Sequence, residues 1–98
     1  MILHFWLKSP VDDALFARVG SGDGVLLQAA NVWMASQGHQ AIEKIQRLQR
    51  HTSRIYVLDD DLKLFGLAEQ QLLKEVQVLS MRQMVELTIS YSVIKTWR

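Results

Sequence analysis

Cysteine is absent from the 98-residue chain, which therefore has no disulfide, no thiolate ligand for a metal and no sulfur nucleophile of its own. The chain also lacks an excess of charge of either sign, because its formal net charge at pH 7 is only +1. A domain that binds nucleic acid by itself normally carries a clear basic excess. Any contact with RNA is therefore expected to be indirect and shared with partner proteins.

Long apolar runs are missing as well. No run approaches the ~20 apolar residues that are needed to cross a bilayer. The N-terminus has neither the positively charged residues nor the small-residue cleavage site of a secretory signal. We therefore expect a cytoplasmic protein with no membrane contact.

Apolar and aromatic residues are plentiful. Hydrophobic residues make up 49% of the chain, and three tryptophans are many for this length. A chain of this size forms one domain, here residues 1–98, with a high surface-to-volume ratio. More apolar surface is present than one small core easily hides, so we expect a subunit interface. Homo-oligomers remain open for the isolated chain.

The chain alternates between strand and helix patterns. The first ten residues are typical of a buried strand that ends at a Ser-Pro break. Ser9 is expected to cap a helix over residues 11–18, with Pro10 at its first position. Further strands are expected at residues 25–28, 54–58, 76–79 and 92–97, and further helices at residues 29–36, 41–48, 59–65 and 81–88. Ser80 should cap the last helix.

Short apolar strands that are separated by helices predict the fold class. The expectation is an α/β domain with a mostly parallel sheet, helices on both faces and right-handed crossovers, flavodoxin-like in outline. The glycine-rich segment at residues 20–24 follows a helix and precedes a strand. A phosphate-binding loop needs the opposite order, so we interpret this segment as a turn.

Three acidic residues and a basic segment are the main polar candidates. Asp59, Asp60 and Asp61 follow a strand at the sheet edge where α/β folds bind ligands. We interpret them as caps of the following helix, with a divalent-ion site as the alternative. The basic stripe consists of Lys44, Arg47, Arg50, His51 and Arg54. We interpret the stripe as a solvated helix face, with RNA or an acidic partner as the alternative.

Histidines and large apolar residues give no catalytic pattern. His4, His39 and His51 lack the spacing of metal ligands, and His4 on an apolar strand is most simply a hydrogen-bonded core residue. No catalytic, cofactor or metal residues are assigned. The residues that we assign to core packing or a subunit interface are Trp33, Met34, Met81, Met84 and Trp97. Trp97 is expected to dock against a neighbouring chain or the body of the domain.

Several short segments in a fixed order resemble the TusB/DsrH family of small sulfur-relay subunits. The similar segments are Leu3-His4 followed by Lys8 and Ser9-Pro10, Gly22-Asp23 leading into residues 25–28, residues 55–58 with Asp60-Asp61-Leu62 and Gly66-Leu67 behind them, and the closing Trp97. The length of the chain agrees with the family as well.

The resemblance implies a DsrEFH-like fold and a role in a heterohexamer with two copies of each of three related subunits. Its partners would be a TusC/DsrF-like and a TusD/DsrE-like subunit, with sulfur-carrier proteins reached through the complex. Such an assembly relays persulfide sulfur toward 2-thiolation of the tRNA wobble uridine, whereas a homologous complex serves sulfur oxidation. The relay thiol belongs chiefly to the TusD/DsrE-type subunit.

The chain departs from the family at two places. Some DsrH-type members carry a cysteine near the end of the first helix, where this chain has Arg18-Val19-Gly20-Ser21. Serine cannot form a persulfide, so we expect a subunit that is not an enzyme, of the tRNA-thiolation type. The family often has an acidic residue and a glycine where this chain has Ala29-Ala30-Asn31. A small ligand-binding or phosphotransfer module that uses Asp59, Asp60 and Asp61 remains the alternative.

Overall fold

Short apolar segments form the strands of one sheet in the computed structural model, which describes residues 1–38, 40–50, 52 and 54–98. The strands are β1 (Ile2–Trp6), β2 (Gly24–Leu27), β3 (Ile55–Leu58), β4 (Gln77–Leu79) and β5 (Val93–Trp97). The helices are α1 (Asp13–Ala17), the 3₁₀ helix η1 (Ala29–Ala35), α2 (Ile42–Gln49), α3 (Asp59–Leu64), the 3₁₀ helix η2 (Glu69–Gln71) and α4 (Met81–Ser90). Sequence analysis gave no element for η2.

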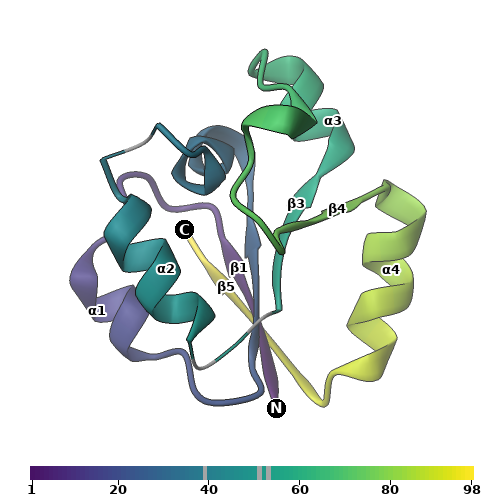
Figure 1. Ribbon diagram of the computed structural model, residues 1–98. Coiled ribbons are helices and arrows are strands. Elements are labelled where there is room, and N and C mark those ends of the chain that lie inside the picture. The colour runs from purple at the N-terminus through teal and green to yellow at the C-terminus, as the bar shows by residue number, and fades with distance from the viewer. Residues whose placement is uncertain (39, 51, 53) are drawn as a thin grey trace.

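All strand pairs are parallel, and the strand order is β4-β3-β2-β1-β5. The predicted α/β class with a parallel sheet is therefore confirmed. The order differs from the 2-1-3-4-5 order of flavodoxin, because β1 here lies next to the edge strand β5. The chain runs stepwise from β1 to β4 and then returns across the sheet through α4 (Figure 1).

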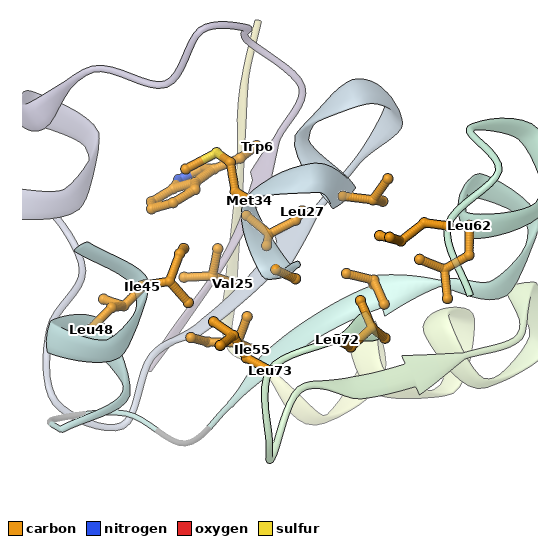
Figure 2. Close-up of a cluster of buried hydrophobic side chains, with 14 of the residues drawn as sticks. Trp6, Val25, Leu27, Met34, Ile45, Leu48, Ile55, Leu62, Leu72 and Leu73 are labelled. Atoms are coloured by element: carbon orange, nitrogen blue, oxygen red, sulfur yellow. The ribbon is translucent and has the colours of Figure 1, made fainter. Parts of the chain in front are cut away.

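One face of the sheet carries the larger core. Side chains from α1, η1, α2 and α3 pack there against β1, β2 and β3. Figure 2 shows this core, in which Trp6, Val25 and Ile55 come from strands and Ile45 and Leu48 come from α2. The alternation of buried side chains along the strands, with Leu26 on one face and Val25 and Leu27 on the other, sends every second residue into this core.

The other face carries a smaller core that receives its helical packing from α4. Leu3, Leu26, Tyr56 and further strand residues pack there against Met84 and Leu87 of α4. In Figure 1, α1 and α2 lie on one side of the sheet and α4 lies on the other. No residue of α4 is fully buried. The second face of the sheet is therefore covered less completely than the first.

The first helix begins later than the sequence predicts. Its N-cap is Asp12, whose Oδ1 accepts a hydrogen bond from the backbone N–H of Leu15 at 3.2 Å. The prediction that Ser9 caps this helix with Pro10 at its first position is therefore wrong. The carboxylate of Asp12 already supplies the acceptor oxygen that an N-cap needs.

The last helix begins where it is predicted to begin. The Oγ atom of Ser80 accepts from the backbone N–H of Gln83 at 3.1 Å, and the Gln83 side chain accepts from the backbone N–H of Ser80 at 2.8 Å. This reciprocal pair is a capping box. It fixes the start of α4 directly after β4.

The segment after β2 forms a 3₁₀ helix instead of the α-helix expected at residues 29–36. Ala29 has a φ angle of +52°, in the left-handed region that favours glycine. The amide of Asn31 donates to the carbonyl oxygens of Trp6 and Lys8 at 2.8 and 2.9 Å, which ties η1 to the end of β1. These anchors hold the segment close to the sheet edge.

Candidate functional site

The predicted interface residues separate into surface and core positions. Trp33 on η1 is 37% exposed and Met81 on α4 is 50% exposed. Met84 is half-buried against the smaller core, and Met34 is buried in the larger one, where Figure 2 shows it near the sheet. Of these four residues, Trp33 and Met81 offer the most surface to a partner.

Trp97 docks against the body of the domain. Its indole plane lies within 19° of the His4 ring plane with ring centroids 6.2 Å apart, and the guanidinium of Arg18 lies 5.0 Å from the centroid of the Trp97 ring. The indole side chain also packs at the edge of the larger core. The chain therefore covers much of this large side chain itself.

A group of exposed apolar side chains lies on α4 and β5, and we name it the α4–β5 surface. Its members are Met81, Val85 and Ile89 of α4 and Ile94 of β5. The three helical residues recur every four positions and so share one side of α4. Ile94 pairs in register with Leu3, a member of the smaller core, so Ile94 faces the same side of the sheet as α4. Sequence analysis missed the roles of Ile89 and Ile94, although the four-residue spacing from Met81 indicates the first.

His4 is the centre of a buried hydrogen-bonded group that joins three strands. Its Nε2 atom lies 3.1 Å from Oδ2 of Asp23, and the indole N–H of Trp97 donates to its Nδ1 atom at 3.1 Å. The parallel register explains this geometry. His4 lies opposite Val25 on β2 and Lys95 on β5, and Asp23 and Trp97 each lie two residues away on the same face.

The direction of each hydrogen bond in this group is fixed by Trp97. An indole N–H can only donate, so Nδ1 of His4 must be an unprotonated acceptor. The ring proton then resides on Nε2 and is donated to the Asp23 carboxylate. His4 is therefore held as one neutral tautomer, as expected for a hydrogen-bonded core histidine.

Asp23 collects several donors at once. Its Oδ1 accepts from the backbone N–H of Ile2 at 2.9 Å, and its Oδ2 accepts from that of Gly20 at 2.9 Å. Burial by itself raises the pKa of Asp23, but the backbone donors, followed by His4, outweigh it and lower the pKa. The carboxylate thus stays ionised and fastens the turn at residues 20–23 to the start of β1. Sequence analysis missed this role, because Asp23 reads as an ordinary turn residue between two glycines.

The segment that follows the first helix is held in place by this group. Gly20 donates to Asp23, and Arg18 covers the Trp97 ring. Gly22 has a φ angle of +86°, which agrees with the predicted turn. The segment therefore places the backbone N–H of Gly20 and the guanidinium of Arg18, and no thiol, against the Asp23 and Trp97 side chains that bond to His4.

The acidic residues after β3 have structural partners. Oδ2 of Asp61 accepts from the backbone N–H of Ala29 at 3.1 Å, and Asp59 forms an ion pair with Lys63 at 3.3 Å. The N-cap of α3 is Leu58, and no side chain caps it by a hydrogen bond. The expectation that these aspartates cap the helix is therefore wrong, although all three lie in its first turn, where carboxylates complement the helix dipole.

The basic stripe lies partly on α2. The Nζ atom of Lys44 is 2.7 Å from Oδ1 of Asp13, and this contact, with a smaller contribution from Arg47, lowers the pKa of Asp13. A groove of about 400 Å³ between α1 and α2 is lined by Phe16, Leu48 and these charged residues. Arg54 donates to the carbonyl oxygen of Gly22 at 3.1 Å. The His51 and His39 predictions lie outside the described residues.

Two searches of the described residues gave negative results. No group of three or more histidine, cysteine, aspartate or glutamate side chains is placed so that it could hold a metal ion. Within the same residues, every helix is too short or too polar to span a bilayer.

Comparisons with known proteins point to one family. The family model described as "DsrH like protein" matches residues 8–94 of the chain. No curated protein sequence gives a significant match. A solved structure with a similar fold is that of the protein of unknown function MTH1491 from Methanobacterium thermoautotrophicum, with a TM-score of 0.69, 16% sequence identity and 96% coverage of both chains.

Proposed function

Because this chain belongs to the DsrH family, we propose that it is a non-catalytic structural subunit of a sulfur-relay complex that serves 2-thiolation of the tRNA wobble uridine. The family membership supports a sulfur-relay subunit that works together with other subunits. The proposed partners are a TusC/DsrF-like and a TusD/DsrE-like subunit in a cytoplasmic heterohexamer.

The observation that carries the proposal is an exposed apolar surface on a chain without a thiol. Sulfur relay needs a thiolate that can form a persulfide, and the 98 residues contain no cysteine. The α4–β5 surface adds several large apolar side chains that a monomer leaves in water. Both features fit a subunit that binds and positions a cysteine-bearing partner.

The segment at residues 18–21 supports the tRNA-thiolation branch over the sulfur-oxidation branch. Some family members carry a cysteine in this segment. Here the backbone N–H of Gly20 donates to Asp23, and the guanidinium of Arg18 lies over the ring of Trp97. A segment held in this way serves the stability of the fold and offers no sulfur acceptor.

A deletion of the gene in its own host tests the proposal. We expect 2-thiouridine nucleosides in digested tRNA, measured by mass spectrometry, to fall strongly and to be restored by the wild-type chain. A control with the empty plasmid should not restore them. Unchanged thiolation in the deletion strain, together with a loss of sulfur oxidation, would contradict the tRNA branch.

The non-catalytic role has a separate test. The purified chain is incubated with a persulfide donor and analysed as an intact protein by mass spectrometry. We expect its mass to remain unchanged, while the cysteine-bearing partner gains sulfur under the same conditions. A covalent sulfur adduct on this chain would show that it takes part in the relay itself.

A further inference from the structure

One strip of the sheet on the α4 side lacks a covering helix among the described residues. Parallel sheets are normally covered on both faces, and here the larger core receives α1, η1 and α2 while the other face receives α4. The smaller core draws on β1 to β4, on Met84 and Leu87 of α4 and on Tyr91 directly after α4. Phe5 on β1 is half-buried, and Ile94 and Thr96 on β5 are exposed. The strip over β5 and over Phe5 at the carboxyl end of β1 is therefore left partly open, whereas Leu3 of β1 is fully buried.

The apolar side of α4 borders this strip. The strands β4 and β5 are parallel members of one sheet, so α4 between them runs antiparallel to the strands. Crossovers of this kind are right-handed, which sets the direction in which α4 is turned relative to β5. With Met84 and Leu87 turned to the sheet, the 100° step per residue then directs Val85 and Ile89 toward β5. The α4–β5 surface and Phe5 of β1 thus form a shelf, with one wall from α4 and a floor from β5 and the carboxyl end of β1.

Basic side chains lie at one end of the shelf. Arg82 at the start of α4 and Arg98 after β5 lie at the carboxyl edge of the sheet, together with Lys8 after β1. Arg82 and Lys8 each have one acidic partner, Glu86 at 3.5 Å and Asp12 at 3.5 Å, and no ion pair involves Arg98 within the described residues. The N-terminal end of α4 adds a partial positive charge there. This end of the shelf therefore favours an acidic group.

A second copy of this chain fits the shelf poorly. In a face-to-face dimer, the outward side of α4, which carries Arg82 and Glu86, would lie on the apolar floor of the other copy. The desolvation of these charges against Phe5 and Ile94 costs more free energy than the apolar contact contributes. A symmetric pairing of the two β5 edges centred on Lys95 would place like charges opposite each other.

We infer that the α4–β5 surface binds an amphipathic helix of a different subunit, whose acidic end lies against Arg82 and Arg98. The apolar side of that helix covers Phe5 and Ile94 and packs against Val85 and Ile89. The inference deepens the proposed function and rests on it, because the helix belongs to one of the sister subunits of the complex.

Tagged variants purified from the host test the surface. Ile89→Asp is compared with the matched control Leu64→Asp, since the two side chains are 81% and 76% exposed and Leu64 lies on α3, outside the surface. We expect Ile89→Asp to reduce the bound sister subunits, quantified by mass spectrometry, at least about tenfold, as for an interface hot spot. Leu64→Asp should stay within about twofold of the wild type, and both variants should keep the wild-type melting temperature.

Each result has one reading. Absence of sister subunits from the wild-type sample would overturn the proposed function and this inference together. Their presence with both wild type and Ile89→Asp would overturn the surface and leave the proposed function intact. A wild-type homodimer that Ile89→Asp converts to a monomer would show that the occupant is a second copy.

A crosslinking experiment identifies the occupant, because an introduced cysteine is unique in this chain. Val85→Cys and, as a control, Leu64→Cys are labelled with a photoreactive maleimide before they are mixed with the sister subunits. We expect Val85→Cys to capture a helical peptide with Asp or Glu at one end, and Arg82→Glu with Arg98→Glu to weaken the capture. Capture of an extended or basic peptide would contradict the inference.

Discussion

The hydrogen-bonded group around His4 makes the substitution Asp23→Asn a sharp test of the structure. The wild-type carboxylate accepts from Ile2 through Oδ1 and from Gly20 and His4 through Oδ2. Asparagine has nearly the same shape but offers one acceptor oxygen and one N–H₂ donor. Either orientation of its amide therefore turns a donor toward at least one N–H group.

The expected cost follows from the contacts that are lost. With the amide nitrogen in place of Oδ1, the Ile2 N–H has no acceptor, and the Gly20 and His4 bonds lose a charged acceptor. With the amide nitrogen in place of Oδ2, two donors are unsatisfied, and His4 cannot change tautomer because Trp97 donates to its Nδ1. An unsatisfied buried donor costs about 1–3 kcal/mol, so we expect a loss of about 2–4 kcal/mol in the free energy of unfolding.

Urea unfolding at pH 7, followed by tryptophan fluorescence, measures this loss. The matched control is Asp12→Asn, because asparagine caps a helix about as well as aspartate and the change should stay within about 0.5 kcal/mol. A change below about 0.5 kcal/mol for Asp23→Asn would refute the proposed hydrogen-bond directions.

The stability difference between the wild type and Asp23→Asn should also depend on pH. The pKa of Asp23 is lower in the folded chain than in the unfolded chain, where a carboxyl of this type titrates near ~3.9. The carboxylate therefore adds stability above about pH 3.9, and this stability is lost as the pH falls through the lower folded pKa. The difference in stability between wild type and Asp23→Asn should accordingly shrink in that acidic range.

Two further predictions concern the α4 side of the sheet. A Cβ atom at Gly24 would lie 2.5 Å from the hydroxyl oxygen of Tyr91, so Gly24→Ala should lower the free energy of unfolding by about 1–3 kcal/mol in urea titrations, whereas Gly38→Ala, with open space around it, should change little. Burial, helped by the nearby Tyr91 hydroxyl, raises the pKa of Tyr56 to about 12. The wild-type chain should therefore lose stability relative to Tyr56→Phe as the pH rises from about 10 toward 12, and a constant difference over this range would contradict the burial of the Tyr56 hydroxyl.

Most of the fold could be predicted from local sequence patterns. Short apolar strands have a clear composition, and residues 55–58 illustrate this with two β-branched residues and a tyrosine. The cap of α4 was predictable because Ser80 directly precedes the helical pattern. The start of α1 was not, since two acceptable caps, Ser9 and Asp12, lie within four residues and only the packing selects between them.

The hydrogen-bonded group around His4 could not be predicted from the sequence, because its members are far apart in the chain. His4 and Asp23 are 19 residues apart, and His4 and Trp97 are 93 residues apart. Their proximity depends on the strand order, which places β1 between β2 and β5. A buried histidine on an apolar strand indicates that some partner exists, but the partner is determined by the register of neighbouring strands.

The α4–β5 surface was half predictable. Met81 and Val85 belong to the apolar pattern of the helix, and that pattern alone is equally typical of a buried helix. The two cases differ in the number of helices on each face. Among the described residues, α4 is the one helix on one face of the five-stranded sheet, whereas several helices share the opposite face. The helical pattern shows which residues are apolar, and the arrangement of the helices on the sheet determines which of them are exposed to solvent.

The two faces of the sheet have different roles in a subunit of this family: one stabilises the fold, and the other leaves apolar residues exposed. The larger core and the His4 group hold the first helix, the turn after it and the C-terminal Trp97 in one arrangement without any thiol. The opposite face leaves apolar residues such as Ile89 and Ile94 free for a partner. A chain without a relay cysteine can contribute to sulfur transfer through the position that it imposes on its neighbours. The exposed apolar side chains of the α4–β5 surface are suited to hold a neighbouring subunit in a fixed position.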